Sequence, residues 1–305
     1  MKTPGQSLVI AARSGNHGEV ARLLAAGASV DACDNDGYTA LMWATRYGHA
    51  ETVTTLLAAG AAVDARDEDA QTALMRAAAN GHVVTVAALL KGGADVDARD
   101  DDAQTALLLA AEYCHTAVVT DLIAVGAVVD ARDKRGRTAM LQAARHGRTA
   151  IVTALIAAGA AVDASDKRGY TALMWAAEEG YAETVTALLA AGAAVDARDS
   201  DGYTALMWAA WRGRTAAVIA LLDAHADVNA RNSDGNTALM WAAEAGRTAT
   251  VTQLLDAGAD VDASNSHGNT ALDWAIEEPT HEALRAAGAP PRSPKAPSQT
   301  RGMQP

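Results

Sequence analysis

The chain is poor in the residues that build a thick core or a covalent framework. It has no Phe among its 305 residues, aromatic side chains make up 4%, and Cys occurs twice, as Cys33 and Cys114. These two cysteines show neither CxxC nor Cys/His spacing, which excludes a disulfide framework and a zinc site and fits a reducing, cytoplasmic location. No window approaches 18 uninterrupted apolar residues, so the sequence predicts no membrane span.

Basic residues are also in the minority. Lys and Arg number 25 against 37 Asp and Glu, which gives a formal net charge of −12. Nucleic-acid binding needs a basic face, so this balance argues against nucleic acid as a partner. The motifs GxGxxG, GxxxxGK[ST], HExxH and GxSxG are missing, and Cys114 beside His115 has no recognisable base or oxyanion site. We therefore expect no enzyme, no cofactor and no metal.

What the sequence does have is a repeat with a period of 33 residues. A Thr-Ala pair recurs at this spacing along the chain, at Thr39, Thr72, Thr105, Thr138, Thr171, Thr204, Thr237 and Thr270. A period of 20 to 50 residues indicates a repeat architecture in which each unit packs only on its neighbours. We number positions from the Asp that opens each unit, so that Asp34 is position 1 of the second repeat.

Each repeat predicts two short helices. In the second repeat, residues 34–37 form a polar turn, Thr39 is a good N-cap, residues 40–47 form one helix and residues 51–58 form another, each ended by Gly. Val at position 20 and Leu at position 23 give the second helix an apolar stripe in unit after unit. Neither helix is long enough to be stable alone, so each pair must bury its stripe against the next pair.

The G-x-T-A-L run, the two-helix spacing, the LLxAGA ending and the V-D-A return resemble the ankyrin repeat, whose signature is T-P-L-H-x-A at this period. Here Ala replaces the Pro, and Met or Leu mostly replaces the His, as at Met42 and Leu108. The resemblance implies an all-α solenoid of about nine helix-turn-helix units joined by β-hairpin-like turns.

The repeat limits predict four regions. Residues 1–33 form an N-terminal capping repeat, residues 34–264 form seven full repeats, and residues 265–289 form a shortened C-terminal cap. Pro279 stands where a Gly is expected, which predicts a short second helix in that cap. Residues 290–305 hold five of the seven prolines and read as a disordered, basic tail.

The resemblance also implies that a protein partner binds at positions 2, 3 and 5 of the turn and positions 13 and 14 of the first helix. These are the positions that vary among the copies while the others repeat. The candidate partner-binding residues taken from them are Tyr113, Lys134, Arg135, Arg137, Arg145, His146, Tyr170, Glu178, Tyr203, Trp211 and Arg212.

A basic repeat interrupts the acidic chain. Residues 132–148 hold six Lys and Arg residues against one acid, Asp133. One interpretation is an anchor for an acidic segment of a partner, because Arg forks suit carboxylates. The other is internal pairing, since position 13 runs Glu112, Arg145, Glu178 and would form an ion-pair ladder. On the anchor interpretation, reversing Arg137, Arg145 and Arg148 to Glu would abolish partner capture without changing the melting curve.

Aromatic residues gather in the later repeats. Tyr170, Tyr203 and Trp211, with Arg212, predict a contact surface, because Tyr, Trp and Arg are favoured at binding hot spots. Position 10 carries Trp in several units, and the favoured interpretation is that these rings stack between neighbouring repeats.

The sequence therefore predicts a non-enzymatic protein–protein interaction scaffold. The alternatives are a self-associating structural protein and a non-catalytic targeting subunit of an enzyme complex.

Overall fold

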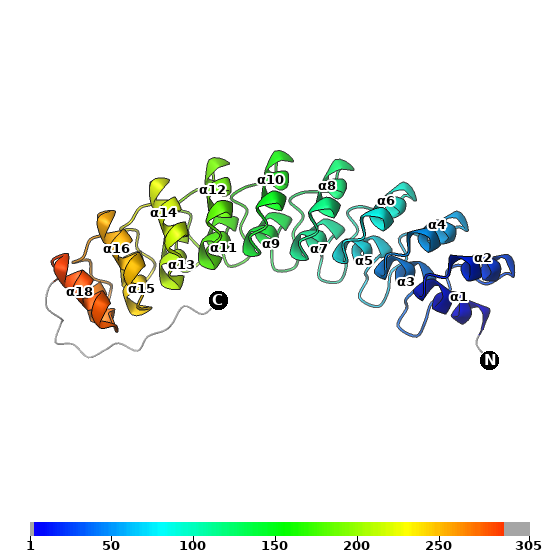
Figure 1. Cartoon of the computed structure of the whole chain (residues 1–305), viewed down its shortest axis with the longest axis horizontal. Coiled ribbons are helices and arrows are strands. Elements are labelled where there is room, and N and C mark those ends of the chain that lie inside the picture. Colours follow the sequence, from blue (N-terminus) through cyan, green and yellow to red (C-terminus); the bar gives the residue numbers. More distant parts are fainter. Residues whose placement is uncertain (1–2, 290–305) are drawn as a thin grey trace. The chain divides into compact units, whose positions relative to one another are not determined.

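The computed structural model describes residues 3–289 and consists of paired helices joined by turns (Figure 1). Contacts divide the chain into two compact units, residues 1–164 and residues 165–305. The predictions made for the tail, residues 290–305, lie outside the described residues. Within the described range, none of the helices combines the length and apolar character that crossing a bilayer requires.

The first unit contains five helix pairs. In each pair the odd-numbered helix comes first, and the odd helices pack on one another, as do the even helices (Figure 1). The bounds are α1 Pro4–Arg13, α2 His17–Ala25, α3 Ala40–Arg46, α4 Ala50–Ala58, α5 Ala73–Ala79, α6 Val83–Lys91, α7 Ala106–Glu112, α8 Thr116–Ala124, α9 Ala139–Arg145 and α10 Thr149–Ala157.

The second unit contains four pairs arranged in the same way, with α11 packed on α13, α13 on α15 and α15 on α17. Its helices are α11 Ala172–Glu179, α12 Ala182–Ala190, α13 Ala205–Arg212, α14 Thr215–Asp223, α15 Ala238–Glu244, α16 Thr248–Asp256, α17 Ala271–Trp274 and α18 Glu278–Ala286.

The predicted caps begin the first helices. The hydroxyl of Thr39 accepts a hydrogen bond from the Met42 backbone N–H at 3.2 Å, and Thr204 does the same for Met207 at 3.4 Å. Gly37 in the turn adopts the left-handed conformation with φ 75°. The turn closes like a hairpin, because Cys33 and Thr39 form an antiparallel bridge. The turn and helix predictions for this repeat are confirmed.

The core follows the predicted stripe. The Val residues at position 20, from Val20 to Val251, are fully buried, and so are the Leu residues at position 23 from Leu56 onward. Burying each such side chain stabilises the fold by about 1.5–3 kcal/mol relative to leaving it exposed to water. Because the stripes meet only across neighbouring helix pairs, this stabilisation exists only in the array.

Residues at position 16 connect consecutive repeats. The His82 ring lies over Gly48, where an added Cβ would sit 2.7 Å from Nδ1, and its Nε2 is 3.0 Å from the Arg46 carbonyl oxygen. Arg214 lies over Gly180 in the same way, and its Nε donates to the Glu178 carbonyl at 3.2 Å. At Gly48 and Gly180 a side chain would therefore be crowded as well as strained by the left-handed φ, whereas Cys114 occupies the same position of its own repeat with φ 67°.

The last repeat corrects one prediction. Its second helix, α18, keeps nine residues, whereas its first helix, α17, has four against seven in α15. Pro279 lies in the first turn of α18, where the missing N–H costs nothing because that group has no partner within the helix. The three residues missing from this repeat are therefore lost from the first helix and not from the second.

Candidate functional site

The basic repeat contributes to a polar cavity of about 390 Å³ in the first unit. The turn before α9 supplies most of its cations, and α7 with the preceding turn supplies the opposite wall. It is lined by Asp102, Gln104, Glu112, Tyr113, Asp133, Lys134, Arg135, Arg137 and Arg145. We call this the basic cavity. Five of the predicted partner-binding residues are thus brought together, and His146 follows Arg145 directly as an exposed residue.

Two cations of the basic cavity are free to bind. Lys134 and Arg135 are exposed, and within residues 3–289 neither side chain has a carboxylate at ion-pair distance. The Lys134 backbone N–H donates to the Asp102 carbonyl at 2.9 Å, so the turns touch through their backbones. Repeat positions 2 and 3 carry Asp101 and Asp102 in the preceding turn, which predicts ion pairs with Lys134 and Arg135, and this prediction is wrong.

Arg137, in contrast, is used inside the protein. Its Nε lies 2.7 Å from Asp133 Oδ2, and its side chain is 14% exposed. The other oxygen of Asp133 accepts backbone N–H groups of Arg135 and Arg137, each at 2.8 Å. Reversing Arg137 to Glu would place a second carboxylate against the buried Asp133. This corrects the prediction that the Arg137, Arg145 and Arg148 reversal leaves the melting curve unchanged.

The opposite wall of the basic cavity carries an exposed ring. Tyr113 is 56% exposed at the C-terminal end of α7. The neighbouring Glu112 carboxylate accepts a hydrogen bond from the Gln104 amide at 3.1 Å. Tyr113 thus presents a large, rigid contact area beside the free cations of the opposite wall.

The second unit overturns the prediction that Glu178 is a surface contact. Its side chain is 1% exposed, and its Oε1 accepts from Arg212 Nη2 at 2.7 Å and from Arg212 Nε at 3.2 Å. Burying a carboxylate requires a partner of this kind. Glu178 and Arg212 therefore join α11 to α13, a pair that differs from the predicted ladder of Glu112, Arg145 and Glu178.

Tyr170 is likewise buried rather than exposed. It is 1% exposed, with its ring centroid 4.8 Å from Trp175 and 5.1 Å from Trp208. Burial, and next the Glu178 carboxylate, raise the pKa of its hydroxyl far above the usual value. The prediction of Tyr170 as a contact residue is therefore wrong, because the following repeat covers it.

Tyr203 and Trp211 are half-buried. Tyr203 lies between Trp208 at 5.1 Å and Trp241 at 5.6 Å, and desolvation raises the pKa of its hydroxyl to about 12. Trp211 meets the edge of Trp208 at 6.0 Å, and the Arg212 guanidinium lies 4.3 Å from its ring centroid. The expected stacking of the position-10 rings is confirmed for Trp208 and Trp241, and Trp211 is less exposed than predicted.

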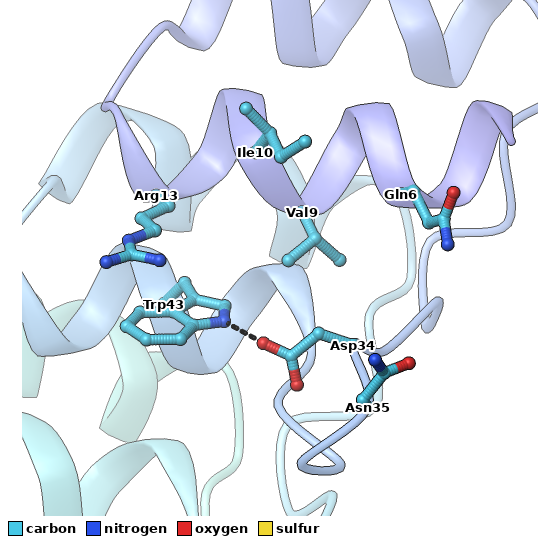
Figure 2. Close-up of a pocket in the computed structure, with 7 residues that line it drawn as sticks. All are labelled: Gln6, Val9, Ile10, Arg13, Asp34, Asn35 and Trp43. Carbon is cyan, nitrogen blue, oxygen red and sulfur yellow. Dashed lines mark hydrogen bonds between the residues drawn. The ribbon is translucent and has the colours of Figure 1, made fainter. Parts of the chain in front are cut away.

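A second cavity, of about 380 Å³, was missed by the sequence reasoning. It lies between α1, α3 and the turn that joins their repeats, and Figure 2 shows its lining residues, which are Gln6, Val9, Ile10, Arg13, Asp34, Asn35 and Trp43. We call this the N-terminal cavity. The signal that points to it is Gly5 at position 5, where other repeats carry Tyr, Gln, Arg or Asn.

These features define a class of protein, a helical-repeat solenoid whose first helices and turns carry binding surfaces. The family model for ankyrin repeats (three copies) matches residues 8–100, 74–166, 107–199, 142–232 and 206–286. The chain belongs to the ankyrin-repeat family.

Among solved structures, the chain is similar to the human ASB11 ankyrin repeat domain. The two share 26% sequence identity with a TM-score of 0.68, over 72% of this chain and 100% of that one. No curated protein sequence matches the chain. Ankyrin repeats are generally protein–protein interaction modules and are typically non-catalytic.

Proposed function

We propose that the chain is a non-enzymatic, intracellular protein-interaction module that binds an acidic segment of a protein partner in the basic cavity. The observation that supports this most is the pair of exposed cations, Lys134 and Arg135. Within residues 3–289, neither side chain has a carboxylate at ion-pair distance. The chain has a net charge of −12, and the same exposed pair of cations recurs one repeat later as Lys167 and Arg168. Tyr113 on the facing wall supplies a hot-spot residue type beside Lys134 and Arg135.

The chemistry of the two cations favours an anionic group on the partner, and a carboxylate fits both of them. An Arg fork binds a carboxylate with two parallel hydrogen bonds, and Lys adds a point charge. The polar lining of the basic cavity, including Gln104 and Tyr113, offers further hydrogen-bond partners for a peptide backbone.

Capture of the partner from the native cell, identified by cross-linking and mass spectrometry, tests the proposal. We expect the double variant Lys134→Glu, Arg135→Glu to lose the partner and to keep the wild-type melting curve, because both side chains are exposed and unpaired. Competition by an oligoglutamate peptide should release the partner from the wild type.

The matched control makes the same charge change on the second helices. Arg22→Glu with Lys91→Glu alters exposed residues of α2 and α6, away from the basic cavity. We expect this control to retain the partner. Undiminished capture by the Lys134, Arg135 double variant would contradict the proposal.

A further inference from the structure

The N-terminal cavity lies where an aromatic ring sits in later repeats. In the second unit, the position-10 ring is covered by the position-5 Tyr of the repeat before it, as Tyr170 covers Trp208 at 5.1 Å and Tyr203 covers Trp241 at 5.6 Å. In the third repeat, Arg76 at position 10 is covered in the same way by Tyr38 of the second repeat, with its guanidinium 4.1 Å from the ring centroid. Position 10 is thus covered from the preceding repeat wherever position 5 carries Tyr.

Trp43 lacks this cover. Position 5 of the first repeat is Gly5, which lies inside α1 and has no side chain to offer. A Cβ at Gly5 would meet the Ala32 Cβ at 2.6 Å, so the repeat has no room for a larger residue there. The face of Trp43 toward α1 is covered instead by the Arg13 guanidinium, 4.4 Å from the ring centroid, and the indole also lines the N-terminal cavity (Figure 2).

The walls of the N-terminal cavity are apolar beside the indole. Val9 points between Trp43 and the turn, and Ile10, 46% exposed, forms the rim (Figure 2). Trp43 is fixed in place, because its Nε1 donates to Asp34 Oδ2 at 2.7 Å, while Asp34 Oδ1 accepts the Tyr38 N–H at 3.0 Å. The one carboxylate in the lining is thus occupied by internal hydrogen bonds, and a preformed apolar wall remains.

Two cations flank the same indole. The guanidinium of Arg13 lies 4.4 Å from the Trp43 ring centroid and that of Arg46 lies 5.6 Å from it. Within residues 3–289, neither has a carboxylate at ion-pair distance. Stacking on the ring leaves the N–H donors at the edge of each guanidinium free for an acidic ligand.

We propose that the N-terminal cavity binds an aromatic side chain of a partner peptide, with an adjacent Asp or Glu of that peptide paired to Arg13 and Arg46. The ring packs in the cavity against Val9 and Trp43, next to the Arg13 guanidinium, and the carboxylate neutralises the two unpaired cations. This inference deepens the proposed function, because it rests on the chain being a peptide-binding module and adds a second contact with its own chemistry.

Titration with short Gly/Ser peptides that carry one Glu-Tyr pair tests this contact on the full chain. The readout is the NMR signal of the Trp43 indole N–H, assigned with the Trp43→Phe variant. We expect a saturable shift of this signal, while a peptide with Glu-Ala produces none and a peptide with Lys-Tyr binds at least several-fold more weakly. Equal affinity for the Glu-Tyr and Lys-Tyr peptides, or an unmoved Trp43 signal, would overturn the proposal.

Protein variants separate this contact from the basic cavity. Arg13→Ala and Ile10→Ser should each weaken Glu-Tyr binding at least threefold with only a small change in melting temperature, because both residues lie at the surface. Arg22→Ala, an exposed Arg on α2, and Lys134→Glu should bind the peptide as the wild type does. If Arg13→Ala and Ile10→Ser bind like the wild type, the N-terminal cavity is not the site, whatever the capture experiment shows for the basic cavity.

Discussion

At the level of single residues, the environment of each charge depends on which residue the next repeat supplies. Glu178 is buried and paired because Arg212 follows it one repeat later. Glu244, at the same position in its own repeat, is half-buried, and within residues 3–289 its Oε2 has no hydrogen-bond partner. Desolvation raises the pKa of Glu244 above its ordinary value of 4.5. Oε2 of Glu178 also lacks a partner within residues 3–289, so the two glutamates differ in the Arg212 ion pair, which only Glu178 has.

Glu244→Gln should stabilise the protein at neutral pH. The folded state holds the Glu244 proton more tightly than the unfolded state, so its contribution is fully present below the unfolded pKa and is lost as pH rises through the folded pKa. Gln does not titrate, so the variant should gain on the wild type by less than about 1 kcal/mol at about pH 7, and the gain should shrink near about pH 4. Urea denaturation at both pH values measures this.

Glu178→Gln is the matched control. It removes the charged partner of Arg212, so it should lower the free energy of unfolding at neutral pH. A Glu244→Gln variant that is less stable than the wild type at neutral pH would show that the carboxylate gains an interaction there.

At the level of elements, one hydrogen bond fixes several of the first helices on their own turns. The position-1 carboxylate accepts from the position-10 side chain, Asp34 from Trp43 at 2.7 Å and Asp199 from Trp208 Nε1 at 3.2 Å. In the eighth repeat Asn232 replaces the Asp, and within residues 3–289 neither its Nδ2 nor Trp241 Nε1 has a partner. Asn232 Nδ2 and Trp241 Nε1 are both donors and cannot bond to each other. The hydrogen bond between turn and first helix is therefore absent for α15, and ring packing holds Trp241 in place.

Trp208→Ala should destabilise the protein by about 3–5 kcal/mol, because it removes a large side chain that is 2% exposed and leaves a cavity. It also removes the ring that Tyr170, Tyr203 and Trp211 contact. Chemical denaturation followed by circular dichroism measures the change. Trp211→Ala is the comparison and should cost clearly less, since Trp211 is half-buried. A loss below about 1 kcal/mol for Trp208→Ala would mean that its contacts contribute little.

At the level of the whole molecule, stability is shared among repeats that contact only the repeats next to them. Odd helices pack on odd helices, even on even, and first on second helices within a repeat. The Asp residues at position 31 add backbone contacts from one repeat to the next, as when Asp31 Oδ1 accepts the Ala62 N–H at 2.8 Å. These contacts have the same register throughout, so repeats are interchangeable as packing units.

Deletion of residues 67–99, one period of 33 residues, should leave a folded array with the same helical signal per residue. Stability should fall, because one set of nearest-neighbour interfaces is lost, and unfolding should stay cooperative. Circular dichroism and thermal melting measure both. Deletion of residues 67–90 is the control, because it breaks the register and should abolish cooperative unfolding. Equal behaviour of the two deletions would show that register does not matter.

The sequence by itself determined the period, the family, the helix starts at Thr and the buried Val and Leu stripes. These features rest on local interactions, such as the cap of Thr39 on Met42 and the left-handed Gly37, which operate within a few residues. The sequence also grouped Lys134, Arg135 and Arg145 as one basic repeat, whereas it did not predict that Tyr113 lines the same cavity.

Only the tertiary structure decided which of the predicted site residues are available. Tyr170 and Glu178 occupy positions that the ankyrin resemblance assigns to partners, yet Trp208 and Arg212 of the next repeat cover them. Arg137 turns inward to Asp133 while the adjacent Arg135 does not. Exposure and pairing depend on contacts between residues about 33 apart, and the identity of both partners decides whether a ring is covered, a charge is neutralised or a cavity such as the one beside Trp43 remains.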